Sequence, residues 1–506
     1  MSHIRRRGLA LAASSALLAG SLLTAGAASA STESATADST PVPTAFVDGY
    51  LMSYVLNTRV ANPGQTRLVE QAVRDAGGVV VQSWPQIGVV VAHSDRAAFR
   101  TDVRRLGGNA LESVGASRTA EVSEGTPTDL SASWGRGASA YKQAHAKPAN
   151  GDLSDAMTTP AAPVADPREA EQWDMVQIKA DQAHTITDGD RNVLVGVLDS
   201  GIDPDHPDLA PNIDVADSVS CVGAGRPSQA PGSWYPTTSD HGTHVAGTIG
   251  AARNGTGIVG VAPNVRMAAV KVVNDDGFIY PEYAICGFVW AGMHKMDVTN
   301  NSYYVDPMEF WCGDQPDQAA VLEAVGRAVR WSTEQGVVHA AAAGNSAKDL
   351  ANKTEDTASP NDTTPMTRVI NNGCKDIPTE LPGVVTVSAT NRAEQLASFS
   401  NRGLGVIDVA APGRTILSTV VKDNGYGTKS GTSMASPHVA GVLALMKSAH
   451  PTWTPEQMVA KLRAQADDRP CSAPETSVTP TPACVGGTAD NSYYGEGIVD
   501  ALDAVQ

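Results

Sequence analysis

The chain has 506 residues, a formal net charge of −17, 42% hydrophobic residues and 18% charged residues. At about 150 residues per domain, this length allows two or three domains with a large buried core. The acidic balance argues against a nucleic-acid partner, because a duplex binder needs a basic face to neutralise phosphates. The composition therefore indicates a globular protein that does not bind nucleic acid.

The first thirty residues have the pattern of a secretory signal peptide. Residues 5–7 are arginines, an apolar stretch follows, and residues 28–30 form a small-residue cleavage site. An uncleaved membrane anchor is the alternative, although the apolar stretch is short and no charge follows it directly. We expect residues 1–30 to be removed and the mature chain to be secreted, extracellular and free of the membrane. The arginines leave the general and the twin-arginine export routes open.

Export places the six cysteines in an oxidising setting, where an even number favours disulfides over free thiols or zinc. These cysteines are Cys221, Cys286, Cys312, Cys374, Cys471 and Cys484. Their connectivity is open from sequence alone. The one pair that the sequence suggests is Cys471 with Cys484, which would close a short loop rich in proline and threonine.

Composition and periodicity divide the rest of the chain into three parts. Residues 45–118 predict a small ferredoxin-like unit with the order βαββαβ. Residues 119–165 are rich in Ser, Ala, Thr, Pro and Gly, so we expect a flexible linker. Residues 166–506 alternate apolar runs with helical patterns. This alternation predicts an α/β fold, a mostly parallel, doubly wound sheet with helices on both faces.

Three polar residues occupy positions where an open α/β sheet gathers its ligands, at the carboxyl ends of strands. Asp199 closes the strand VLVGVLD, His241 opens the helix HGTHVAGT, and Ser433 opens the helix SMASPHVAGVLALM. These are the parts of a nucleophilic triad, in which the imidazole takes the serine proton and the carboxylate orients the imidazole. A serine at a helix start also has N–H groups nearby for the oxyanion.

Each of these residues also has a structural interpretation. Ser433 alone would be a helix N-cap, and Asp199 could open a turn. His241 and His244 could be core histidines or could share a metal, although no third ligand is evident nearby. The order Asp, His, Ser favours one kind of triad, because α/β hydrolases run Ser, Asp, His and chymotrypsin-like enzymes run His, Asp, Ser.

Five stretches extend the pattern: VLDSGIDPDHPDL, HGTHVAGT, AAAGN, APG and GTSMASPHVAG. In this order, the chain from about residue 166 onward resembles the subtilisin family. The resemblance implies a secreted serine endopeptidase that acts on protein or peptide substrates, with Asp199 orienting, His241 as general base and acid, and Ser433 as nucleophile. It also implies that the Asn345 amide joins the Ser433 N–H in an oxyanion hole. A turn residue after Gly344 is the alternative for Asn345.

The resemblance further implies that the unit 45–118 is a propeptide, which assists folding and then blocks the active site as an intramolecular inhibitor. A slowly folding parallel sheet gains from such a template. Any small ferredoxin-like module is the alternative. We expect the mature enzyme to be a monomer that needs no cofactor for its chemistry. Weak activity in a protein-binding scaffold, or acyl transfer and leader processing, are two functional alternatives that use the same residues.

Members of the family bind substrate as an extended strand between two segments and a pocket wall. The corresponding residues here are Gly277 and Ile279; Ser302, Tyr303 and Tyr304; and Ala342, Ala343 and Gly344. The two tyrosines replace a usual aliphatic residue and a glycine, so they predict a reshaped pocket and restricted specificity, unless a local insertion turns them outward. The wall at residues 342–344 admits apolar side chains.

A structural Ca²⁺ site is also implied by the resemblance. Asp208 and Asn254 match two ligand positions of the family, and Glu169 stands where a glutamine is usual. Oxygen donors of this kind suit calcium. The alternative for Asp208 is a turn after Pro207.

Overall fold

A computed structural model describes residues 38–125, 165–475 and 483–506. The predicted signal peptide and most of the predicted linker lie outside the described residues. No helix in these ranges is both long enough and apolar enough to cross a membrane.

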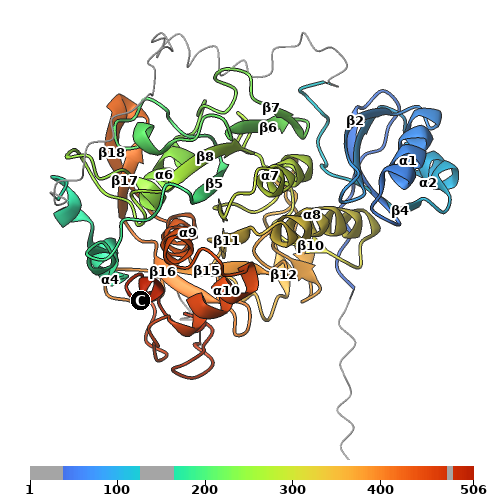
Figure 1. The fold of residues 1–506 in the computed structure, drawn as a ribbon. Coiled ribbons are helices and arrows are strands. Elements are labelled where there is room, and N and C mark those ends of the chain that lie inside the picture. Colours follow the sequence, from blue (N-terminus) through green and yellow to red (C-terminus); the bar gives the residue numbers. More distant parts are fainter. Residues whose placement is uncertain (1–37, 126–164, 476–482) are drawn as a thin grey trace, which may run out of the picture. The chain divides into compact units, whose positions relative to one another are not determined.

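A mostly parallel sheet forms the centre of the larger part of the chain (Figure 1). Its strand order is β16-β15-β11-β9-β5-β8-β6-β7, and only the edge pair β6 with β7 is antiparallel. The strands are β5 (Leu194–Asp199), β6 (Val219–Gly223), β7 (Arg226–Ser228), β8 (Arg266–Lys271), β9 (Val298–Asn301), β11 (Val338–Ala342), β15 (Val384–Thr390) and β16 (Val409–Pro412). The predicted fold class is confirmed.

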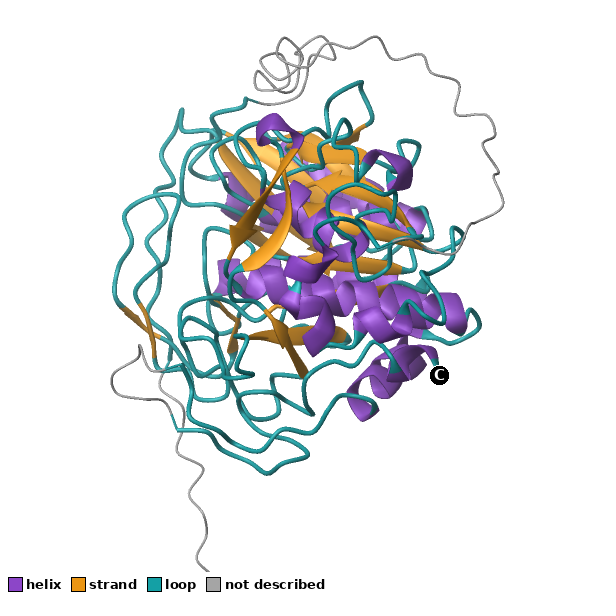
Figure 2. Ribbon diagram, turned by 90° about the vertical axis from the view of Figure 1, so that its left-hand side faces the viewer, coloured by secondary structure: helices purple, strands orange, loops and turns teal. Residues whose placement is uncertain are grey.

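Helices cover both faces of this sheet (Figure 2). The long helices are α6 (His241–Gly250), α7 (Pro281–Met293), α8 (Pro316–Glu334) and α9 (Thr432–Ala449). Side chains of β5 alternate between the faces, as a strand requires. Val195 and Val197 pack in the cluster with α6 and α9, whereas Leu194 and Leu198 pack with α7 and α8. Burial on both faces explains why the strand reads as a continuous apolar run.

Shorter elements surround the sheet. They are α4 (Trp173–Gln177), α5 (Ala180–Ala183), α10 (Pro455–Ala464), β10 (Trp311–Cys312), β12 (Glu355–Asp356), β13 (Arg368–Val369), β14 (Cys374–Lys375), β17 (Ile416–Val420), β18 (Gly425–Lys429), η1 (Glu169–Glu171), η2 (Ala210–Asn212), η3 (Lys422–Asn424) and η4 (Asp503–Val505).

The predicted order βαββαβ of the small unit is confirmed. Its elements are β1 (Met52–Thr58), α1 (Pro63–Asp75), β2 (Val79–Trp84), β3 (Val89–Ser94), α2 (Phe99–Gly107) and β4 (Leu111–Ala116). The strands form an antiparallel sheet in the order β2-β3-β1-β4. Asn62 caps α1 by accepting a hydrogen bond from Gln65 N at 2.9 Å, and Pro63 follows at the first helical position.

Strands β1 and β4 of the small unit pack against α8. Arg327 donates from Nη1 to Thr58 O at 2.7 Å. Gly115 lies directly against the backbone of Asp317, where a Cβ atom would collide with the carbonyl oxygen. A glycine is therefore required in β4 for the strand to approach the helix this closely.

The residues that directly follow the small unit are hydrogen-bonded to other parts of the protein. Thr119 N and Ala120 N donate to Asp362 Oδ2 at 2.8 and 2.9 Å, and Val122 N donates to Leu51 O at 2.9 Å. Residues 119, 120 and 122 of the predicted linker therefore contact other parts of the chain. Composition missed this because the partners of these N–H groups lie far away in sequence.

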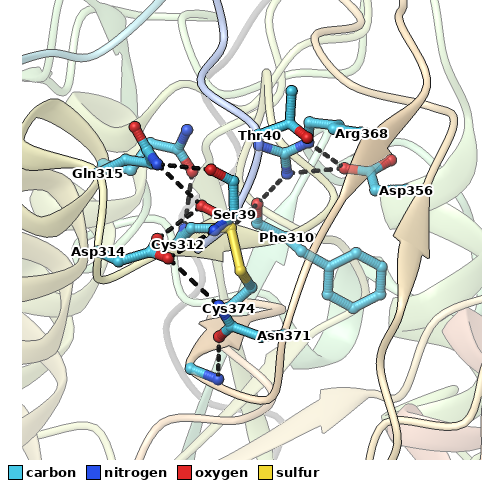
Figure 3. The surroundings of a disulfide bond; sticks show 12 residues. Ser39, Thr40, Phe310, Cys312, Asp314, Gln315, Asp356, Arg368, Asn371 and Cys374 are labelled. Atoms are coloured by element: carbon cyan, nitrogen blue, oxygen red, sulfur yellow. Dashed lines mark hydrogen bonds and ion pairs between the residues drawn. A yellow bond between two sulfur atoms is a disulfide. The ribbon is translucent and has the colours of Figure 1, made fainter. Parts of the chain in front are cut away.

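The described residues form three disulfides: Cys221–Cys286, Cys312–Cys374 and Cys471–Cys484. The predicted pair Cys471–Cys484 is confirmed. Cys312–Cys374 links β10 to β14, and Figure 3 shows Phe310, Asp314 and Gln315 around it. In the same region Ser39 N donates to Asp314 Oδ2 at 2.7 Å, so the segment before the small unit also contacts the larger part.

A buried cation holds the small unit to α7. Arg118 has a side chain 1% exposed and pairs with Glu282, which is 0% exposed, and with Glu124 at 3.0 Å. Its guanidinium carbon lies 3.8 Å from the ring centroid of Tyr280. Burial makes each charge dependent on its partner, because neither has water to replace it.

We predict that Arg118→Met destabilises the uncleaved chain by about 3–5 kcal/mol, because Glu282 is left buried without its cation. The measurement is urea denaturation of the Ser433→Ala chain with and without the second substitution. Arg105→Met is the matched control, since Arg105 is 68% exposed and its pair with Asp102 contributes little. Equal losses in the two variants would contradict the prediction.

Candidate active site

Asp199 and His241 meet at the carboxyl edge of the central sheet. Asp199 is the last residue of β5 and 1% exposed, and His241 is the first residue of α6. His241 Nδ1 lies 2.9 Å from both Oδ1 and Oδ2 of Asp199, and Ser200 N donates to Oδ1 at 2.7 Å. The carboxylate thus holds the proton on Nδ1 and leaves Nε2 to act as a base.

Ser433 is the second residue of α9, and a proline shapes its surroundings. Pro437 has no N–H, so the carbonyl of Ser433 lacks its usual helical donor. Ser302 Oγ supplies one at 2.8 Å, while Ser433 Oγ donates to Ser302 O at 3.3 Å. Among the described residues there is no hydrogen bond between Ser433 and His241, a contact that commonly tightens only when substrate binds.

Asn345 is oriented by the residue before the serine. Its Oδ1 accepts from Thr432 N at 2.8 Å and from Thr432 Oγ1 at 2.9 Å. The amide oxygen is therefore used, and Nδ2 is the group left to donate to another acceptor. Gly344 has φ +98, and a Cβ there would collide with Asn401, so this turn requires glycine.

A pocket of about 320 Å³ lies beside these groups. The residues predicted from sequence that line it are Gly277, Ile279, Ser302, Tyr303, Tyr304, Ala342, Gly344, Asn345 and Ser433. Ala343 is not among the lining residues. Its side chain is fully buried and packs in a cluster with Phe310 and Leu350, because successive side chains of an extended segment point to opposite sides.

Both tyrosines line this pocket, and their hydroxyl groups are hydrogen-bonded within the protein. Tyr304 OH accepts a hydrogen bond from Asn361 Nδ2 at 3.0 Å, and Tyr303 OH donates to Asn301 Oδ1 at 3.1 Å.

The backbone N–H and carbonyl of Ile279 are both hydrogen-bonded to Asp306. The N–H donates to Asp306 Oδ2 at 2.5 Å, and the carbonyl accepts from Asp306 N at 2.8 Å.

Sequence reasoning missed several lining residues: Phe278, Asp306, Glu309, Ser346, Asn361, Asp376 and Thr432. Asp306 and Glu309 follow the two tyrosines closely, so their position in the sequence was the available signal. Asp376 follows β14 and has no local signal, because only the fold brings this loop to the pocket.

His244 is a core histidine in this structure. Its Nε2 lies 3.1 Å from Ile416 O and 3.2 Å from Gly427 O, so this nitrogen donates its hydrogen to carbonyl groups. Burial lowers the pKa of His244 to about 3, which keeps the ring neutral. With Nε2 committed to these carbonyls, the arrangement does not support a metal shared by His241 and His244.

The residues predicted to bind calcium already have hydrogen-bond donors. Asp208 accepts from Tyr426 OH at 2.8 Å, Thr256 Oγ1 at 3.0 Å and Ile258 N at 3.1 Å. Asn254 donates from Nδ2 to Asp208 Oδ1 at 3.3 Å.

Glu169 is likewise occupied, since it pairs with Arg253. A calcium shell is built from oxygen lone pairs, so Ca²⁺ would have to displace these donors. In the parts of the chain that the structure describes, the one acid and cysteine cluster with metal-like spacing is Cys312, Asp314 and Cys374, and a disulfide uses both sulfurs.

We therefore predict that a calcium chelator leaves the melting temperature of the protein unchanged, because Arg253 and Tyr426 satisfy the carboxylates that a cation would otherwise neutralise. The measurement is thermal unfolding in excess calcium and in excess chelator, with Tyr426→Phe as a second variant. A melting temperature that rises with calcium would restore the site implied by the sequence resemblance.

Comparison with known proteins identifies the family of the chain. A model of the subtilase family matches residues 190–497. The chain is 37% identical over 330 residues to a subtilisin of Bacillus pumilus, which covers 65% of this chain and 97% of that protein. It is 36% identical over 330 residues to subtilisin E of Bacillus subtilis, with 65% and 70% covered.

Solved structures show the same fold. The epidermin leader peptide processing serine protease of Staphylococcus aureus superposes with a TM-score of 0.62 at 19% identity, covering 90% of this chain and 98% of that one. Fervidolysin of Fervidobacterium pennivorans has a TM-score of 0.60 at 23% identity, with 92% and 62% covered. The chain belongs to the subtilase family and is a subtilisin-like serine endopeptidase.

Proposed function

We propose that the protein is a secreted endopeptidase that hydrolyses peptide bonds through an acyl-enzyme, with Asp199, His241 and Ser433 as its triad. The observation that carries the proposal is the pair of 2.9 Å contacts between His241 Nδ1 and the buried Asp199 carboxylate. They lie at the edge of the sheet where Ser433 opens α9 beside a pocket.

In this proposal Ser433 Oγ attacks the substrate carbonyl while His241 Nε2 accepts its proton. Asp199 stabilises the imidazolium that forms. The developing oxyanion receives hydrogen bonds from the Ser433 N–H and from Asn345 Nδ2, whose amide is oriented by Thr432. His241 then protonates the leaving amine, and a water molecule activated by the same base releases the acyl group. The residues need no cofactor for these steps.

We also propose that residues 45–118 are a propeptide that inhibits the enzyme until it is cleaved, after export directed by residues 1–30. The support is the close contact of the small unit with α8 and the buried pair of Arg118 with Glu282. Removal of this unit would leave the mature protease as a monomer.

Tyr303 and Tyr304 support restricted specificity, because two aromatic side chains line the pocket beside Ser433.

Acyl transfer to an amine uses the same catalytic residues. Leader peptide processing is the activity of one structural neighbour, but at 19% identity that likeness extends to the fold alone. Hydrolysis is therefore the proposal, and product masses in the presence of an added amine distinguish it from transfer.

We predict that the wild-type chain loses an N-terminal fragment ending between Arg118 and Asp166, and that Ser433→Ala does not, because cleavage needs the nucleophile. The measurement is intact mass followed over time after expression. Ser430→Ala is the matched control, since this serine is exposed and accepts a hydrogen bond from Thr415 N. Identical trimming of wild type and Ser433→Ala, or none in either, would contradict autoprocessing.

The pH dependence of the reaction follows from the surroundings of His241. Burial opposes its charged form, but the Asp199 charge and hydrogen bond outweigh burial and raise the pKa of His241 above 6.5. A general base must be neutral, so kcat/KM is expected to fall as the pH drops through this raised pKa.

We predict an acid limb of kcat/KM with its midpoint above pH 6.5, measured on a chromogenic peptide. Lys429→Met should move the midpoint to higher pH, because the Lys429 charge lowers the pKa of His241 and its removal also leaves Asp240 unpaired. Lys447→Met, which removes a cation 3.9 Å from Asp297, is the control. A midpoint at or below 6.5, or a downward shift in Lys429→Met, would refute this account.

A further inference from the structure

The pocket beside Ser433 contains three carboxyl groups that the proposed mechanism does not use. Asp306, Glu309 and Asp376 line it together with Tyr304 and Asn361. Their exposed fractions are 4%, 5% and 1%. Carboxylates are rarely buried to this extent unless a positive charge accompanies them.

The three groups come from two segments that the fold joins. Glu309 lies just before Cys312, and Asp376 lies just after Cys374. The disulfide between these cysteines and the pairing of β10 with β14 hold the two segments together (Figure 3). Arg368 adds a hydrogen bond to Phe310 O and a buried ion pair with Asp356. The acidic wall of the pocket is therefore held rigidly.

No cation accompanies these carboxyl groups in the pocket. Within the described parts of the chain, none of the residues that line it is lysine, arginine or histidine. Asp306 accepts hydrogen bonds from Ile279 N and from Asn361 Nδ2 at 2.6 Å, both neutral donors. Asp376 Oδ1 is buried and has no hydrogen-bond partner among the residues that the structure describes.

Nearby cations are engaged elsewhere. Lys353 lies 2.6 Å from Glu380 and also donates to Leu350 O, and Lys375 is 3.4 Å from Glu380. Lys348 donates to the carbonyl of Glu355 at 3.1 Å. These contacts leave the pocket with a deficit of positive charge.

The pKa values reflect this deficit. Burial raises the pKa of Asp306 to about 7. Burial also raises the pKa of Glu309, and burial with the charges of Glu380 and Glu309 raises that of Asp376. A positive charge brought into the pocket would restore these groups to their ionised form.

We infer that this pocket receives the basic side chain of an arginine or lysine immediately before the scissile bond, with Asp376 as the main specificity-determining residue. The inference rests on the proposed function, because it places the substrate carbonyl at Ser433. A guanidinium or ammonium group supplies the donors that Asp376 Oδ1 lacks and the charge that the three carboxyl groups share. The wall at residues 342–344, expected to admit apolar side chains, forms only one side of the pocket.

The test compares fluorogenic peptides that differ only in the residue before the scissile bond: arginine, lysine, leucine or glutamate. With the processed wild-type enzyme, kcat/KM for the arginine or lysine peptide should exceed that for the leucine peptide by about 100-fold or more, and glutamate should be the poorest. A leucine peptide cleaved as well as both basic peptides would overturn the inference.

Asp376→Asn should lower kcat/KM for the basic peptides by about 10- to 100-fold and leave the leucine peptide within about threefold, so activity on leucine reports an intact fold. Asp276→Asn is the matched control, since Asp276 is an exposed acid next to Gly277 that does not line the pocket. Equal effects of the two variants would show that overall charge, and not Asp376, sets the preference.

Failure of the inference and failure of the proposed function give different results. If no peptide of the series is cleaved and Ser433→Ala behaves as wild type does, the proposed function fails. If leucine and glutamate peptides are cleaved efficiently in a reaction that Ser433→Ala abolishes, the proposed function stands and only the inference about the acidic pocket is lost.

Discussion

The parallel register of the central sheet is the constraint on which the site depends. Leu198 of β5 pairs with Asn301 of β9, and Asn301 pairs with Ala341 of β11. Because parallel strands end at a common edge, the next residues in each chain segment, Asp199, Ser302 and Ala342, emerge side by side. A shift of one residue in any pair would turn the corresponding side chain toward the opposite face and remove it from the cleft.

The helices that begin at this edge complete the arrangement through hydrogen bonds to the strand ends. Ser302 links a strand to a helix in this way. It follows β9, and its Oγ donates to the Ser433 carbonyl, which Pro437 leaves without a helical donor. Thr432 holds the Asn345 amide in one orientation. The groups expected to contact the reacting carbonyl are therefore fixed by partners that do not react. Such preorganisation lets donors stabilise a developing charge without reorganising during the reaction.

The sequence predicted the fold class, the order βαββαβ and the meeting of Asp199 with His241, because each depends on local patterns whose spacing is visible in the chain. It did not predict Asp376, since only the Cys312–Cys374 link and the short pairing of β10 with β14 bring that loop to the pocket. The surroundings of the calcium site implied by resemblance were not predicted for a related reason: Tyr426 and Arg253 come from other parts of the chain and contact its carboxylates.

The acidic wall of the pocket carries an energetic cost that the surrounding structure offsets. Three buried carboxyl groups without cations destabilise the folded state whenever they ionise, because burial favours their protonated forms. The segments that carry them are held by a disulfide and by the buried pairs Arg368–Asp356 and Lys353–Glu380. These restraints prevent the loops from relaxing toward water, where the carboxyl groups would be hydrated. The electrostatic cost of burying these carboxyl groups therefore persists in the folded protein, and a positively charged ligand would relieve it. This relief is the physical basis for selectivity at this site.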